Sequence, residues 1–146
     1  MGQQQLLLVI LVTIIVGIAT VVAINVFGTS AASANVDAVR NDVLGIASSS
    51  QGWYIKPDMM GGGGNSFTGI DFTKFNFSAD TIDTNDPTIA KNMNGTYVLA
   101  ATAAELTVTA YPSSDDAYAA ANGPTVIPQA GTPLTAIITK GNVNWQ

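Results

Sequence analysis

The sequence predicts an α+β fold in which a long N-terminal helix packs against a small C-terminal antiparallel β-sheet. Two observations carry this prediction: the first third of the chain has helical periodicity, and the part after Pro57 consists of short runs with period two. The expected organisation is an N-terminal helix at 1–56, a glycine-rich loop at 57–66 and an antiparallel β domain at 67–146. The helix itself divides into an apolar half at 1–28 and an amphipathic half at 29–56.

The apolar half contains an uncharged run from Leu6 to Gly28, interrupted by the polar residues Thr13, Thr20 and Asn25. At about 1.5 Å per residue, a helix of this length covers roughly 35 Å, enough to cross a hydrocarbon core of about 30 Å. No Lys or Arg precedes the run.

Four interpretations of this run compete. A cleaved secretory signal needs a basic start and a shorter apolar core, and a buried core helix of this length needs a much larger domain. A single-span anchor is viable, but its usual cytoplasmic Lys or Arg is missing. The fourth is a helix that visits the membrane and then packs against copies of itself. Gly17, Ala19, Ala23 and Gly28 favour it by allowing close backbone approach, while the two threonines can hydrogen-bond within or between helices.

The amphipathic half carries one apolar stripe. Val36, Val39, Val43 and Ala47 recur at helical spacing, whereas the charged residues Asp37, Arg40 and Asp42 lie off that stripe. Residues 28–33, rich in small polar residues, form the weak point of the helix. We therefore expect one long helix, or two nearly collinear ones, from about Gln4 to about Gln51, with the second half lying along a globular domain.

The loop that follows combines Pro57 with four consecutive glycines, Gly61–Gly64. A phosphate-cradling function fails on spacing, because no Lys-Ser/Thr pair follows the glycines and no strand precedes them. The segment is interpreted as a structural loop that ends the helix.

Short strand-like runs fill the β domain. Leu106, Val108 and Ala110 alternate with polar or aromatic neighbours, as expected for a half-buried strand. Turn signals stand at Asn94-Gly95, Asn122-Gly123 and Lys140-Gly141. The predicted strands are 70–77, 96–102, 105–111, 124–128 and 134–140.

Composition restricts the functional classes. The chain has 146 residues, a net charge of −5 and only five basic residues, with no cluster of them, so binding of nucleic acid through its phosphates is not expected. It lacks Cys and His, which removes disulfides, thiolate metal sites and the commonest general base. The sequence therefore predicts a protein that is not an enzyme, with no catalytic residue, metal or cofactor.

Four further groups are candidates for chemistry. Asp80, Asp83 and Asp86 do not match the spacing of a calcium loop and are interpreted as a solvated acidic loop, with a Ca²⁺ site as the alternative. Asp115-Asp116 is interpreted as a surface turn rather than a catalytic pair. Asn76 and Asn94 each fit the N-glycosylation pattern, which is a weak signal. The aromatic residues are expected to form the seam between helix and sheet rather than a relay path: Trp53, Tyr54, Phe67, Phe72, Phe75 and Phe77.

An apolar, then amphipathic, helix followed by a small β domain resembles the type IV pilin and pseudopilin superfamily over the whole chain. The segments "MGQQQLLLVIL", "WYIKP" and "GGGGNSFTG" are similar to those of short bacterial pilin-like proteins. The resemblance implies insertion into the inner membrane, extraction by a pilus assembly machinery and polymerisation of identical subunits, whose helices bundle in the fibre core. The expected location is thus an extracellular cell-surface filament, reached through the membrane.

The resemblance also assigns roles to residues. Pilins usually carry a glutamate at the fifth mature position, where it contacts a neighbouring subunit. Counted from Met1 this position is Gln5, so an amide hydrogen bond would replace an ion pair, and counted from Gln3 it is Leu7, which can form no ion pair. Gly2 is the candidate processing glycine, with Gln3 as the first mature residue. The chain departs from pilins by lacking a basic leader and the proline of the apolar half. The residues expected to pack in the filament core are Leu6, Leu7, Leu8, Ile10, Leu11, Ile14, Ile15, Gly17, Ile18, Val21, Val22, Ile24 and Phe27.

The leading hypothesis is therefore a major structural subunit of a type IV pilus-like filament. The alternatives are a surface binding module on a membrane anchor that never polymerises, and a minor pseudopilin of a secretion system. The sequence does not choose among adhesion, motility and DNA uptake, and it does not give the helical symmetry.

Overall fold

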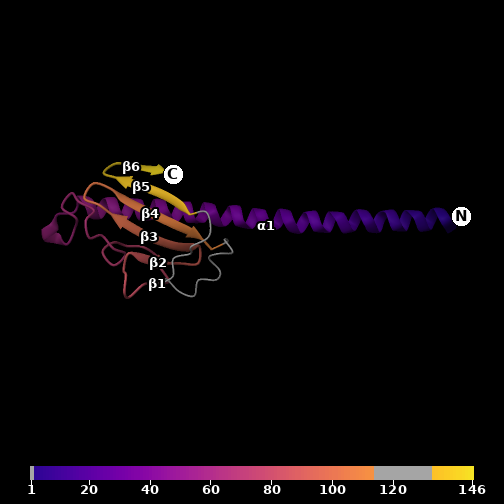
Figure 1. Ribbon diagram of the computed structural model, residues 1–146, viewed down its shortest axis with the longest axis horizontal. Helices are drawn as coiled ribbons and strands as arrows, with labels where there is room; N and C mark the ends of the chain where they lie inside the picture. Colours follow the sequence, from indigo (N-terminus) through magenta and orange to yellow (C-terminus); the bar gives the residue numbers. More distant parts are fainter. Residues whose placement is uncertain (1, 114–132) are drawn as a thin grey trace. The chain divides into compact units, whose positions relative to one another are not determined.

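The computed structural model describes residues 2–113 and 133–146 (Figure 1). The chain divides into two compact units, Met1–Ala34 and Asn35–Gln146, which are described separately below. The helical elements are α1 (Gly2–Ile55) and a 3₁₀ helix, η1 (Asp58–Met60). The strands are β1 (Thr81–Ile82), β2 (Ile89–Lys91), β3 (Gly95–Ala101), β4 (Leu106–Pro112), β5 (Leu134–Thr139) and β6 (Asn142–Trp145).

In the unit Asn35–Gln146, the strands form one sheet in the order β1-β2-β3-β4-β5-β6, each antiparallel to its neighbours. The longest ladder joins β3 to β4 and runs from Gly95 opposite Pro112 to Ala101 opposite Leu106. Along β4, buried and half-buried residues alternate strictly, which confirms the predicted period of two. The α+β fold expected from the sequence is therefore the observed one.

The part of α1 that belongs to this unit buries one face against the sheet. The predicted stripe is confirmed at Val39, Val43 and Ala47, and it continues through Ile46 and the aromatic pair at the helix end. On the sheet, the inward side chains of β3, β4 and β5 complete the core. They are Tyr97, Leu99, Leu106, Val108, Ala110, Ala136 and Ile138.

The glycine-rich loop closes the C-terminal end of α1. The backbone N–H groups of Gly63, Gly64 and Asn65 donate to the carbonyl oxygens of Trp53, Lys56 and Tyr54, at 2.9 to 3.0 Å. These carbonyls would otherwise lack a partner, since a helix leaves its last acceptors free. The loop thus has the structural role expected of it.

The predicted strand at 70–77 is wrong, because this segment consists of turns and irregular chain. The carboxylate of Asp71 accepts the backbone N–H of Thr73 at 2.9 Å, a local side-chain turn that competes with a strand ladder. The phenylalanines of the segment still form the expected aromatic seam: the ring centroids of Phe72 and Phe77 lie 5.2 Å apart, as do those of Phe77 and Tyr97.

The strands predicted at 96–102, 105–111 and 134–140 correspond to β3, β4 and β5, with ends shifted by one residue. The short strands β1, β2 and β6 were not predicted. The expected strand at 124–128, the turn at Asn122-Gly123 and the pair Asp115-Asp116 lie outside the described residues.

Candidate assembly surface

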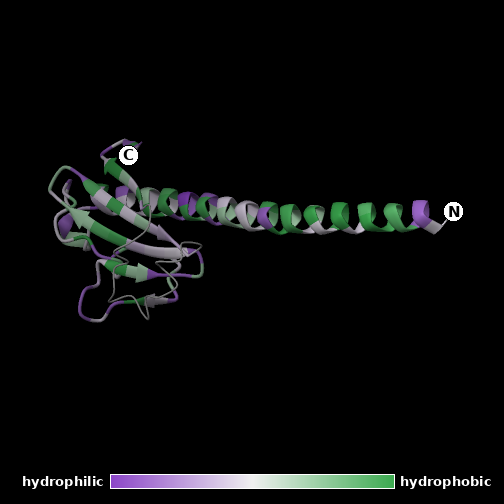
Figure 2. Cartoon of the chain, turned by 45° about the vertical axis from the view of Figure 1, so that its right-hand side comes forward, coloured by the Kyte–Doolittle hydropathy of each residue, from purple (hydrophilic) through white to green (hydrophobic). Residues whose placement is uncertain are grey.

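The unit Met1–Ala34 consists, in its described part, of helix with an exposed apolar surface all round. Sixteen large apolar side chains between Leu6 and Phe27 are exposed, with exposed fractions from 47% to 74%. Figure 2 shows the mostly hydrophobic colouring of this part of the helix. Soluble monomers rarely expose a continuous apolar surface of this extent. Within the described residues, α1 is the helix that is long and apolar enough to cross a membrane.

Every residue expected to pack in a filament core lies on this surface, in helical conformation and exposed. Gly2, Gln3 and Gln5 lie in the first turns of α1 and are exposed as well. The structure adds four valines that the sequence-based list omitted: Val9, Val12, Val16 and Val26. They were recognisable, because a helix that is apolar all round has no face to exclude.

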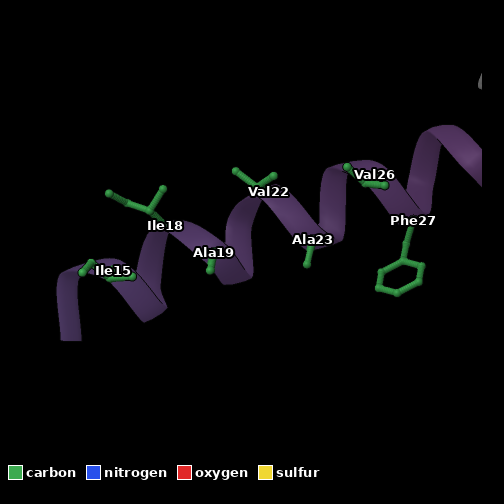
Figure 3. A pocket seen from close by; sticks show the side chains of 7 residues that line it. All are labelled: Ile15, Ile18, Ala19, Val22, Ala23, Val26 and Phe27. Carbon is green, nitrogen blue, oxygen red and sulfur yellow. The ribbon is translucent and has the colours of Figure 1, made fainter. Parts of the chain in front are cut away.

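The helix of this unit carries a shallow apolar groove (Figure 3). Ala19, Ala23 and Phe27 project to the same side of the helix, each one turn further along. The two alanines are small enough for another backbone to approach closely at this point. The groove is lined by Ile15, Ile18, Ala19, Val22, Ala23, Val26 and Phe27.

The polar side chains of the apolar run are satisfied within the helix. The Oγ1 hydroxyl of Thr13 donates to the carbonyl of Ile10, and that of Thr20 donates to the carbonyl of Val16, both at 2.8 Å. Of the two hydrogen-bonding roles considered for these threonines, the structure shows the one within the helix. Their hydroxyl donors can therefore enter an apolar environment without being left unpaired.

The unit Asn35–Gln146 contains a polar cluster that the sequence did not predict. Oδ2 of Asp42 accepts hydrogen bonds from Nδ2 of Asn92 and Nδ2 of Asn94, both at 2.8 Å, and from the hydroxyl of Tyr97 at 2.7 Å. Burial raises the pKa of Asp42, but the hydrogen bonds from Asn94, Tyr97 and Asn92 outweigh it and hold the pKa below its ordinary value. We call Asp42 and its three donors the Asp42 cluster.

The sequence places Asp42, with Asp37 and Arg40, off the apolar stripe and indicates no partner for it. The Asp42 cluster shows that Asp42 has a structural role in addition. Asp37 and Arg40 are both exposed, and they pair with each other at 3.3 Å. Asp42 instead fastens the helix of this unit to β3 and to the turn before it.

The acidic loop is less solvated than expected. Asp80 is exposed, but Asp83 is only 5% exposed, and its Oδ1 accepts the backbone N–H of Asn85 at 2.8 Å. The carboxylate of Asp86 is occupied by Thr88, whose N–H donates at 3.1 Å and whose hydroxyl donates at 2.5 Å. Among the described residues, no group of three acidic, His or Cys side chains is placed to hold a metal ion.

The two glycosylation candidates differ in environment. Asn76 is exposed, in the loop before β1. Asn94 is half-buried, and the Nδ2 atom to which a glycan would attach donates to Asp42. Glycosylation at either residue stays a prediction, and at Asn94 it would compete with the Asp42 cluster.

Comparisons of the chain with protein-family models, with curated proteins and with solved structures find no match.

Proposed function

We propose that this chain is the structural subunit of a type IV pilus-like filament and that it polymerises through its apolar N-terminal helix. The observation that carries the proposal is the exposed, uncharged run from Leu6 to Gly28, which continues in the same helix into a folded β-rich unit. The subunit is inserted in the membrane before assembly and lies in an extracellular fibre afterwards. Its partners are identical copies and a machinery that assembles them.

The driving force for assembly is burial of the apolar run. If each of the sixteen exposed side chains contributes about 1 kcal/mol, their transfer from water is worth on the order of 15 kcal/mol. A bilayer supplies the same gain, so the hydrophobic term alone does not separate a filament subunit from an anchor. The groove over Ala19 and Ala23 favours a helix bundle.

The test introduces a charge into the apolar run of the full chain. We expect Ile14→Lys or Val21→Lys to abolish filaments in material sheared from the cell surface, while the unit Asn35–Gln146 keeps its fold. Met59→Lys is the matched control, because Met59 is a fully exposed apolar residue of the other unit. Normal fibres from the Ile14 variant, seen by negative-stain microscopy, would refute the proposal.

The second candidate is a surface binding module on a single membrane anchor, favoured by the length and apolarity of α1. Gly17→Leu separates it from a subunit, since the added side chain is apolar and a Cβ atom at residue 17 would have no neighbour within 4 Å beyond the adjacent residues and the backbone of its own helix. An anchor surrounded by lipid accepts this change, whereas a helix packed closely at Gly17 does not. Loss of filaments with normal membrane insertion supports the bundle. Equal amounts of fibre from the parent chain and from the Gly17→Leu variant would count against close packing at residue 17.

A minor pseudopilin of a secretion system remains a variant of the same proposal. The abundance of this chain in isolated fibres, measured by quantitative mass spectrometry, distinguishes a major subunit from a minor one.

A further inference from the structure

Asn94, in the turn before β3, and Gly95, the first residue of β3, form an Asn-Gly dipeptide, a sequence with a known chemical weakness. In a flexible chain, the backbone nitrogen after an asparagine can attack the side-chain amide, and glycine offers the least steric resistance to that attack. We propose that Asn94 is a deamidation site that the native fold protects, so that Asn94 deamidates readily only when the chain unfolds. This inference does not depend on the proposed function.

In the folded unit the leaving group and the nucleophile of this reaction both donate hydrogen bonds. Nδ2 of Asn94, the leaving group, donates to Oδ2 of Asp42 at 2.8 Å. The backbone N–H of Gly95, the nucleophile, donates to Oδ1 of Asn92 at 3.0 Å, and the N–H of Asn94 donates to the same oxygen at 2.9 Å. Because the attack requires Gly95 to lose its amide proton, a hydrogen bond that stabilises the N–H form slows it.

Two further contacts hold the turn in place. The carbonyl oxygen of Asn94 accepts hydrogen bonds from Nδ2 of Asn35 at 3.0 Å and from the backbone N–H of Ser113 at 2.8 Å. Gly95 is buried and pairs with Pro112 in the β3–β4 ladder. The main chain on both sides of the reactive bond is thus fixed, which opposes the rotation that brings the Gly95 nitrogen to the Asn94 side chain.

Packing explains why a dipeptide prone to deamidation is present at this position. A Cβ atom at residue 95 would lie 2.4 Å from the carbonyl oxygen of Tyr111 and 3.3 Å from a methyl group of Val39. Only glycine fits there, so the fold cannot use a bulkier residue to slow the reaction. It relies on hydrogen bonds to Asn92 and Asp42 instead.

The reaction balances without an oxidant or reductant. A bond forms between the Gly95 nitrogen and Cγ of Asn94, the Cγ–Nδ2 bond breaks, and ammonia leaves. Water then opens the succinimide to aspartate or isoaspartate at residue 94.

Either product would replace a donor to Asp42 with a second carboxylate. Two like charges at this distance repel, and isoaspartate also lengthens the main chain at the start of β3. A chain deamidated while unfolded therefore returns to a less stable native state.

The experiment follows residue 94 in the full chain, in a nonionic detergent at mildly alkaline pH, with and without urea. Peptide mass spectrometry measures its conversion, and Asn122-Gly123 in the urea-treated sample is the internal reference for an unfolded Asn-Gly bond. We expect conversion at Asn94 to be at least roughly tenfold slower without urea, as for any site opened only by unfolding. Equal rates in the two conditions would overturn the proposal.

A pair of variants separates local protection from general stability. Asn92→Ala removes the acceptor of the Gly95 N–H, whereas Val108→Ala loosens the core on β4 without removing any contact of the turn. At denaturant concentrations that give both variants the same folded fraction, Asn92→Ala should convert several-fold faster at residue 94. Equal conversion in the two variants would show that the turn contacts do not protect the site.

Discussion

Removal of the Asp42 carboxylate should destabilise the unit Asn35–Gln146 more than any other single polar substitution on its helix. The hydrogen bonds that Oδ2 accepts from Asn92, Asn94 and Tyr97 are 2.7 to 2.8 Å long. A hydrogen bond to a charged group is worth about 1.5–3 kcal/mol, but bonds that share one acceptor are not additive. Because Tyr97 is fully buried, its hydroxyl would also lose a partner. For Asp42→Ala we expect a loss of about 3 kcal/mol in the free energy of unfolding.

The Asp42 carboxylate also makes the free energy of unfolding depend on pH. The pKa of Asp42 is lowered in the folded state, so the unfolded chain binds the proton more readily. The stabilisation is therefore complete above the unfolded pKa, near 3.9, and is lost as pH falls through the lower folded value. Asp42→Asn keeps the shape but removes this titration. Its stability should fall less steeply below about pH 4 than that of the parent chain.

Urea unfolding of the full chain in nonionic detergent provides the assay, with fluorescence of the buried Trp53 as the signal. Asp37→Ala is the matched control, since Asp37 is an exposed carboxylate on the same helix and pairs with exposed Arg40. Such surface pairs contribute about 0–1 kcal/mol. If Asp42→Ala and Asp37→Ala cost the same, or if the acid dependence survives in Asp42→Asn, the stabilising role assigned to Asp42 is wrong.

Four more substitutions test the packing of this unit, each by urea unfolding. Gly95→Ala should cost about 3 kcal/mol or more, because its Cβ would lie 2.4 Å from the carbonyl oxygen of Tyr111; near-parental stability would contradict the close approach of β3 and β4. Gly63→Ala should be similarly harmful, since its Cβ would lie 2.5 Å from the indole ring at the helix end, whereas Gly61→Ala, in open space but at φ +74°, should cost only about 1 kcal/mol. Val108→Ala, at a fully buried position of β4, should cost about 2 kcal/mol, and a smaller loss would indicate that the core closes around the missing methyl groups.

Elements defined by local periodicity were predictable from the sequence. The uncharged run needs no tertiary information to be recognised, because its apolar residues cover every face of the helix. The stripe through Val39, Val43 and Ala47 and the alternation along β4 likewise follow from spacing alone. For the same reason the sequence alone predicts almost all of the candidate assembly surface, missing only Val9, Val12, Val16 and Val26.

Features that depend on partners far along the chain were not predictable. The donors to Asp42 lie 50 to 55 residues away, so nothing near Asp42 distinguishes it from exposed Asp37. The segment 70–77 alternates like a strand, but the Asx turn at Asp71 and the packing of its phenylalanines decide its conformation. The burial of Asp83 has the same origin, since its charge and loop context are typical of solvated residues.

The composition of the core makes assembly and folding separately testable. Every member of the described hydrophobic core lies at Val39 or beyond, and the three donors to Oδ2 of Asp42 all come later in the chain than Asp42. The run from Leu6 to Phe27 supplies no side chain to that core, although it is the most apolar part of the chain. A charge at Ile14 should therefore make transfer of the helix into a helix bundle or a bilayer less favourable. It should not change the urea midpoint of the β-rich unit. A variant that lost both filaments and stability would show that the apolar run contributes to the fold and would remove the basis for assigning it to assembly.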